Sequence, residues 1–199
     1  SVNFLKELRK MLGCDNSTGF MQTKWDGAPS VVCGTDPNSG MFFVGTKSVF
    51  AINSKACYRD ADVDLYYEGD LAEKLKYSLK YFSTLGIQGI VQGDLLFTTD
   101  VKRETVNGEK LYTFTPNTIT YGIPVDHPIG VATSRAKIGV VFHTHYRGNN
   151  FQTMQAVAGA KVKGSIEVLS VDNDTPMDRV GLNHSEEVLF DKYVANIEK

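Results

Sequence analysis

The sequence predicts an α+β protein in which antiparallel sheets are flanked by helices. Two observations support this fold class: hairpin turns separate several short β-type runs, and amphipathic helical patterns occur at both ends and in the middle of the chain. Hairpins outnumber β-α-β crossovers, which argues against a doubly wound parallel sheet. No repeat, low-complexity tract or linker interrupts the sequence. We therefore expect a single domain over residues 1–199, ending in a helix at about residues 185–197.

Three segments have the apolar spacing of amphipathic helices. Their apolar side chains recur every three or four positions, so each would bury one face. Gly13 and Gly86 are plausible stops for the first two, and Asn183 or Ser185 can cap the third. The three expected helices comprise residues 2–12, 70–85 and 185–197.

Short runs of β-branched and aromatic residues predict the strands. Residues 36–40 and the Asn-Gly pair at 107–108 are typical hairpin turns, and residues 140–142 are consecutive and apolar, as in a buried strand. A short helix is expected within residues 151–157, and the aspartate-rich stretch 51–67 is expected to be a loop. The β-type runs comprise residues 28–34, 41–46, 87–97, 106–114, 118–123, 137–146 and 161–171.

The composition limits the functional classes. The net charge of −2 gives no overall basic field for nucleic acid, although a local basic channel is compatible with it. Cys14, Cys33 and Cys57 are an odd number without Cys-x-x-Cys spacing, which argues against a disulfide framework and a cysteine zinc site. No apolar run approaches the ~18–20 residues that cross a bilayer. We therefore expect no membrane partner and a reducing, cytoplasmic location.

The Lys-Trp-Asp-Gly segment at residues 24–27 provides the first candidate for chemistry. A lysine becomes a nucleophile only after losing a proton, which requires desolvation or nearby positive charge. Lys24 lies just ahead of an apolar strand, where a neighbouring metal and other lysines would lower its pKa. Asp26 can orient the amine or a ribose, and Gly27 permits a tight turn. A plain surface turn is the alternative, because Lys-x-Asp-Gly is common.

Further polar side chains occur within the later apolar strands. Asp94 follows Gly93 inside such a run, where a carboxylate is costly unless it is paired or bound to a cation. His143 and His145 alternate along another strand, so we expect both to face the same side. This spacing suits metal ligands, but no third ligand can be identified. Polar lining of a cleft is the alternative.

The order of these segments resembles that of the covalent nucleotidyltransferases: DNA ligases, RNA ligases and mRNA capping enzymes. Lys24 resembles the motif I lysine, which takes AMP or GMP as a phosphoramidate. Asp94 resembles the acidic residue of motif III, which serves the ribose or a phosphate-bound Mg²⁺. Lys161 and Lys163 resemble the Lys-x-Lys of motif V, whose two ammonium groups grip the α-phosphate from one face of a strand.

The resemblance assigns a nucleotide-binding role to two more positions, whereas one position departs from the family pattern. Lys47 occupies the place of a basic residue that contacts the nucleotide or nucleic-acid phosphates, and Tyr121 that of a ring that stacks on the base, with Phe114 as second candidate. Ile138 stands where motif IV has a metal-binding glutamate. Three explanations are open: another carboxylate binds the metal, the protein uses metal in a different way, or its nucleotidyltransferase activity is weakened.

The resemblance implies an ATP-grasp-like domain that uses ATP and Mg²⁺ and forms a lysyl-AMP intermediate. RNA ligase is preferred over DNA ligase, because residues 164–199 are too few for a further oligonucleotide-binding domain. One alternative is a catalytically silent module of the same fold that binds nucleotide or nucleic acid. Another is a metal-dependent hydrolase built on His143, His145 and nearby aspartates. With the segments Lys-Trp-Asp-Gly-Ala-Pro at 24–29, Gln-Gly-Asp-Leu at 92–95 and Pro-Asn-Thr-Ile at 116–119, the whole chain also resembles a family of uncharacterised tailed-bacteriophage proteins. A phage origin would make the expected cytoplasm that of an infected host cell.

The expected partners are a nucleotide and RNA or DNA ends. Since the net charge is negative, only a local patch can attract phosphates, so we expect weak and strongly salt-dependent nucleic-acid affinity. The candidate patch comprises Lys47, Arg135, Lys137, Arg147, Lys161 and Lys163.

Overall fold

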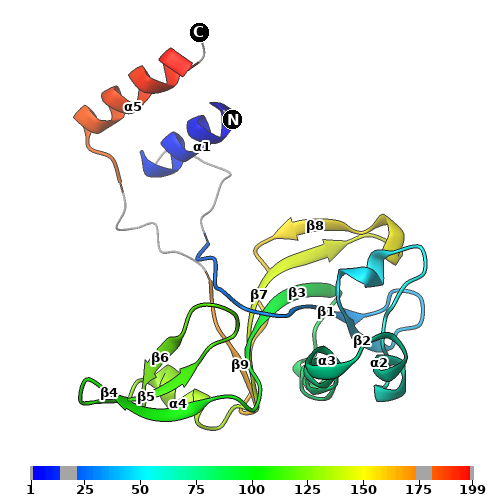
Figure 1. The fold of residues 1–199 in the computed structure, drawn as a ribbon. Helices are drawn as coiled ribbons and strands as arrows, with labels where there is room; N and C mark the ends of the chain where they lie inside the picture. Colours follow the sequence, from blue (N-terminus) through cyan, green and yellow to red (C-terminus); the bar gives the residue numbers. More distant parts are fainter. Residues whose placement is uncertain (1, 14–21, 174–180, 198–199) are drawn as a thin grey trace. The chain divides into compact units, whose positions relative to one another are not determined.

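The computed structural model describes residues 2–13, 22–173 and 181–197. Within these residues the chain is α+β with antiparallel sheets and helices, which confirms the predicted fold class (Figure 1). Contacts divide the chain into two compact units. The smaller unit combines residues 1–24 with residues 174–199, and the larger unit comprises residues 25–173.

The smaller unit pairs the two terminal helices, α1 (Val2–Leu12) and α5 (His184–Ile197). Arg9 of α1 forms ion pairs of 3.2 Å with Glu187 and 3.1 Å with Asp191. The side chain of Asn183 accepts a hydrogen bond from the Glu186 N–H, and the Glu186 carboxylate accepts one from the Asn183 N–H. This reciprocal capping box confirms Asn183 as the N-cap.

The larger unit is built on a central sheet with the strand order β2-β1-β3-β7-β8, in which β9 also pairs with β7. All neighbouring strands are antiparallel except β7 and β9. The strands are β1 (Ser30–Thr35), β2 (Phe42–Gly45), β3 (Ile90–Phe97), β7 (Ile138–Arg147), β8 (Gln155–Ala158) and β9 (Val168–Ser170).

A second sheet contains β4 (Lys102–Val106), β5 (Glu109–Phe114) and β6 (Tyr121–Pro124), followed by the short helix α4 (Pro128–Thr133). Asn107 and Gly108 join β4 to β5 with φ of 51° and 84°, as a two-residue hairpin turn requires. The predicted Asn-Gly hairpin is therefore confirmed.

Two helices, α2 (Asp60–Tyr66) and α3 (Gly69–Phe82), cover one face of the central sheet near β1 and β2 (Figure 1). We call this the helix-covered face; Val31 and Val91 of the sheet pack there in one apolar cluster with Leu75 and Phe82 of α3. On the opposite face, two apolar clusters lie at the two ends of β3. One contains Ile90, and the other contains Leu96.

Three segments differ from their predictions. Residues 51–67, expected as a loop, contain α2, because Asp62 accepts hydrogen bonds from the Tyr58 and Arg59 N–H groups and so caps the helix start. Residues 151–157 form a single 3-10 turn, η3 (Phe151–Thr153), and then enter β8. Within residues 161–171 only β9 is a strand.

No described helix combines the length and apolar character needed to cross a membrane. Cys33 and Cys57 are free, buried thiols, and Cys14 lies outside the described residues. Burial strongly raises the pKa of Cys33, and burial with the nearby Asp62 charge raises that of Cys57 to about 11. Neither thiol therefore has the properties of a reactive cysteine.

The β1–β2 turn contains a buried carboxylate. Asp36, only 5% exposed, accepts hydrogen bonds from the Asn38 N–H (2.9 Å), Ser39 Oγ (2.7 Å) and Tyr58 Oη (2.9 Å). Burial opposes ionisation, but these hydrogen bonds outweigh it and hold the Asp36 pKa below its ordinary value. Burial and the Asp36 contact raise the pKa of Tyr58 to about 12.

Asp36→Asn is expected to lower the free energy of unfolding by about 1–3 kcal/mol at neutral pH, because the amide cannot accept all three bonds. Since the pKa of Asp36 is lowered on folding, the wild-type advantage is complete above the unfolded pKa of about 3.9 and disappears as pH falls through the lower folded pKa. Urea unfolding at several pH values across this range measures the difference in the free energy of unfolding between the wild type and Asp36→Asn. Asp126→Asn, at an exposed position, is the control. A difference independent of pH would contradict the assignment.

Candidate functional site

The segment that precedes β1 is seated on β3. The Ala28 N–H donates to the Leu95 carbonyl (2.9 Å), and the Leu95 N–H donates to the Pro29 carbonyl (3.0 Å). A Cβ added to Gly27 would lie 2.6 Å from the Asp94 Cβ, so only glycine permits this approach. Residues 27–29 and 94–95, which belong to two separate candidate segments of the sequence, are therefore in direct contact.

Asp26 ties this segment to the loop that leads into β6. Its carboxylate accepts hydrogen bonds from Asn117 Nδ2 (2.9 Å) and from the N–H groups of Thr118 (2.7 Å) and Ile119 (2.8 Å). Its own N–H donates to Tyr121 Oη over 2.8 Å. The structure thus uses Asp26 to position a loop more than ninety residues away. Its predicted role beside the Lys24 amine stays a prediction.

An aromatic row continues from this segment into the second sheet. The rings of Trp25 and Tyr121 lie 5.0 Å apart, those of Tyr121 and Phe114 are stacked at 5.6 Å, and those of Phe114 and Phe97 lie 5.1 Å apart. Tyr121 is therefore packed between two aromatic rings, and a base could stack on it only if a neighbour moved. Trp25, which the sequence analysis did not assign a role, shares this partly exposed position.

Asp94 of β3 faces His143 of β7. The carboxylate Oδ1 lies 3.4 Å from His143 Nε2, and both side chains are 26% exposed. The other ring nitrogen, Nδ1, lies 2.8 Å from Thr144 Oγ1, which fixes the orientation of the ring. Both residues are candidates from the sequence, but nothing in their spacing predicts that they meet.

The two histidines do not face the same side, so that prediction is wrong. The ladder between β3 and β7 shifts register between Gln92 and Gly93, which leaves His143 as the extra residue of a β-bulge. Beyond the bulge, His145 pairs with Val91, whose side chain packs on the helix-covered face. His143 instead reaches Asp94 on the opposite face. A single metal site that uses both histidines is therefore incompatible with the fold.

A buried polar network adjoins Asp94 on the same face. Gln92, only 6% exposed, donates through Nε2 to Ser30 Oγ (2.7 Å) and accepts from Tyr146 Oη (2.5 Å). Burial raises the pKa of Tyr146, so its hydroxyl stays protonated and can donate. These side chains form a polar strip between the two apolar clusters of this face, together with Asp94 and His143.

Two of the lysines predicted to serve the site, Lys24 and Lys47, are exposed. Lys24 ends the N-terminal segment of the smaller unit and directly precedes Trp25 in the chain. Lys47 begins the 3-10 helix η1 (Lys47–Phe50). Phe50, at the other end of η1, packs against Tyr146 of the polar strip with ring centroids 4.4 Å apart.

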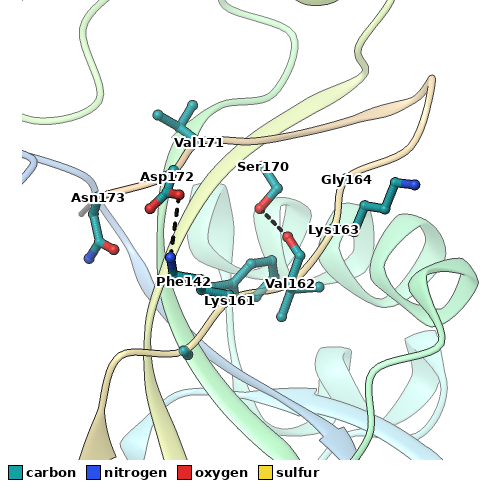
Figure 2. Close-up of a pocket in the computed structure, with 10 residues that line it drawn as sticks. Phe142, Lys161, Val162, Lys163, Gly164, Ser170, Val171, Asp172 and Asn173 are labelled. Carbon is teal, nitrogen blue, oxygen red and sulfur yellow. Dashed lines mark hydrogen bonds and ion pairs between the residues drawn. The ribbon is translucent and has the colours of Figure 1, made fainter. Parts of the chain in front are cut away.

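Lys161 and Lys163 line a cavity of about 460 Å³ at another place (Figure 2). Lys161 Nζ lies 3.7 Å from the Asp172 carboxylate, whereas the Lys163 ammonium points away from that pair in Figure 2. Phe142, which packs on the helix-covered face, also lines the cavity, and Asp94 does not. The structure therefore does not bring Asp94 and this lysine pair into one cleft. The remaining lining residues are Ala160, Val162, Gly164, Ser170, Val171 and Asn173.

The described residues contain no group of three or more His, Cys, Asp or Glu side chains arranged to hold a metal. Ile138, at the motif IV position, is fully buried in the apolar core and offers no ligand atom. Asp94 could supply one oxygen to Mg²⁺, which proteins commonly hold through one or two carboxylates, water and substrate phosphates. The donor set thus fits a metal that arrives with a phosphate ligand.

Asp26→Ala is expected to release the loop at residues 117–119, because three hydrogen bonds lose their acceptor. We expect a decrease of about 1–3 kcal/mol in the free energy of unfolding and a red shift of the emission of Trp25, the only tryptophan of the chain. Asp126→Ala, an exposed aspartate in the same unit, is the control. Unchanged emission in Asp26→Ala would show that the carboxylate does not hold this packing.

Comparison with known proteins gives one match. The model of a "Family of unknown function (DUF6267)" matches residues 1–199. No curated protein and no solved structure matches the chain. Because the match covers the entire sequence, the protein belongs to the DUF6267 family.

Proposed function

We propose that the protein is an ATP-dependent nucleotidyltransferase of the polynucleotide ligase type, in which Lys24 forms a lysyl-AMP intermediate. One observation carries the proposal: the segment that follows Lys24 is seated on Asp94, so the regions that resemble motifs I and III meet. The antiparallel sheets flanked by helices are compatible with the proposed ATP-grasp-like fold.

In the proposed reaction, Lys24 Nζ loses a proton and attacks the α-phosphorus of ATP. A nitrogen–phosphorus bond forms, and the bond from the α-phosphorus to the bridging oxygen breaks, so pyrophosphate leaves with the electron pair. The adenylate then passes to an RNA or DNA end. Mg²⁺ would neutralise the developing phosphate charge, with Asp94 as an oxygen ligand.

Residues around Lys24 would position the nucleotide without reacting themselves. Asp26 holds the loop at residues 117–119 and the Tyr121 hydroxyl, and so fixes the backbone that follows Lys24. Gly27 allows that backbone to approach Asp94. Trp25 and Tyr121 are partly exposed beside Asp26, so the aromatic pair is a better candidate for contact with the base than Tyr121 alone.

The second candidate is a catalytically silent module of the same fold that binds nucleotide or nucleic acid. Two observations favour it. Lys161 and Lys163 line a cavity that Asp94 does not share, so they supply no phosphate clamp there. Ile138 is buried, so the motif IV position supplies no metal ligand.

Intact mass spectrometry after incubation with ATP and Mg²⁺ distinguishes the two. The enzyme should gain one adenylate, about 330 Da, since the reaction releases pyrophosphate. Lys24→Ala should abolish the adduct, whereas Lys192→Ala, an exposed lysine of α5, should keep it. An adduct that persists in Lys24→Ala refutes the assignment of the nucleophile. ATP binding without any adduct supports the silent module.

Nucleic-acid binding by this chain is expected to be weak and steeply salt-dependent. With a net charge of −2, only a few local lysine and arginine contacts can release counterions. The log–log slope of affinity against salt should therefore be only a few units. Fluorescence anisotropy with single-stranded RNA and DNA measures it. Tight binding that ignores added salt would contradict the expectation and indicate recognition by base stacking.

A further inference from the structure

The contact between Asp94 and His143 leaves one polar atom without a partner. His143 Nε2 is completely buried and has no hydrogen-bond partner among the described residues, although Asp94 Oδ1 lies 3.4 Å away. That separation is longer than a normal N–H···O bond. Buried polar atoms in native proteins are usually satisfied, so an unpartnered one calls for an explanation, and a bound ion is one of them.

The hydrogen bond at the other ring nitrogen is compatible with a cation as that ligand. His143 Nδ1 lies 2.8 Å from Thr144 Oγ1. When Nδ1 donates its proton to that hydroxyl, Nε2 presents a lone pair toward the Asp94 carboxylate. Two electron-rich atoms then face each other, and a cation between them would stabilise both. Metal-bound histidines are commonly oriented by such a bond at the second nitrogen.

We propose that Asp94 and His143 form a binding site for a divalent transition metal ion. An ion about 2.1 Å from both Asp94 Oδ1 and His143 Nε2, which are 3.4 Å apart, would have a ligand–metal–ligand angle of about 108°, near the tetrahedral value. Imidazole nitrogen suits ions such as Zn²⁺, Fe²⁺ and Ni²⁺, and carboxylate oxygen suits Mn²⁺ as well, whereas Mg²⁺ prefers oxygen ligands alone. With only two protein ligands, the ion keeps open positions for water or phosphate oxygens.

The β-bulge brings the two ligands together. It adds His143 to β7 opposite the Gln92–Gly93 step, and bulges of this kind redirect side chains near functional sites. Gly93 permits the bulge, because a Cβ there would lie 2.8 Å from the Val141 carbonyl and 2.9 Å from the Phe142 ring. Gly93 therefore leaves space for the bulge, and Asp94 lies next to His143, the residue that the bulge adds.

The role of this ion in nucleotidyl transfer rests on the function proposed above, whereas the metal site itself does not. In that role the ion would hold phosphate oxygens of ATP at its open positions. The imidazole of His143 would then replace the carboxylate that motif IV lacks at Ile138.

Electron paramagnetic resonance of Mn²⁺, titrated into the full chain after chelator treatment and without nucleotide, tests the site directly. The wild type should bind one Mn²⁺, and His143→Ala and Asp94→Asn should each weaken binding at least 10-fold. His145→Ala is the matched control, since this histidine lies on the same strand but faces the other side of the sheet. It should leave the affinity unchanged.

Three results would overturn the proposal: a wild type that binds no Mn²⁺, a His143→Ala variant with wild-type affinity, or equal loss in His145→Ala. Trp25 emission and the melting temperature identify a misfolded variant, and His143→Asn then replaces His143→Ala. Co²⁺ provides a second readout, since tetrahedral coordination should give visible absorption that His143→Asn removes. Because no nucleotide is present, these outcomes are independent of whether Lys24 forms an adduct.

Discussion

The carboxylate of Asp26 is the interaction on which the arrangement of the candidate site depends. It connects the segment before β1 to residues 117–119, and the Asp26 N–H is bonded to Tyr121 at the start of β6. The strands of the two sheets do not pair with each other, so hydrogen bonds from a loop complement the apolar packing between them. Charge-assisted bonds of this kind are stronger than neutral ones, and three of them converge on one side chain.

The rest of the site lies on the face of the central sheet opposite the helix-covered face, and the packing on that face determines its surroundings. Apolar clusters lie at both ends of β3, and the polar strip from Gln92 to Asp94 lies between them. Inside such surroundings a carboxylate and an imidazole interact more strongly than in water, and they become costly when unpaired. Asp94 and His143 are partly buried in this strip, so a cation between them would be held more strongly than in water, which links the proposed metal site to the proposed chemistry.

Much of the fold could be predicted because its determinants are local. The Asn107–Gly108 turn, the cap at Asn183 and the apolar period of α3 are each encoded within a few residues. The seven-residue helix α2 was missed because aspartates typical of loops are equally typical of a helix N-terminus, and Asp62 is used in the second way.

The candidate site was less predictable, because its contacts join distant segments. Asp26 was recognised as important, but the sequence gives no sign that its partners lie at residues 117–119. The opposite orientations of His143 and His145 depend on a bulge, which breaks the two-residue alternation on which the prediction relied. Similarly, regular spacing placed Lys161 and Lys163 on one strand face, whereas the chain there is not part of any sheet.

The nucleotide is proposed to bind beside the Trp25–Gly27 segment. Nuclear magnetic resonance tests it most directly, because the single tryptophan gives one indole N–H signal, and the Trp25 Nε1 atom is buried without a hydrogen-bond partner among the described residues. Titration with ATP and Mg²⁺ should shift this signal in a saturable manner. An unchanged indole signal, together with saturable shifts of residues that line the cavity of Lys161 and Lys163, would contradict the claim and move the nucleotide site there.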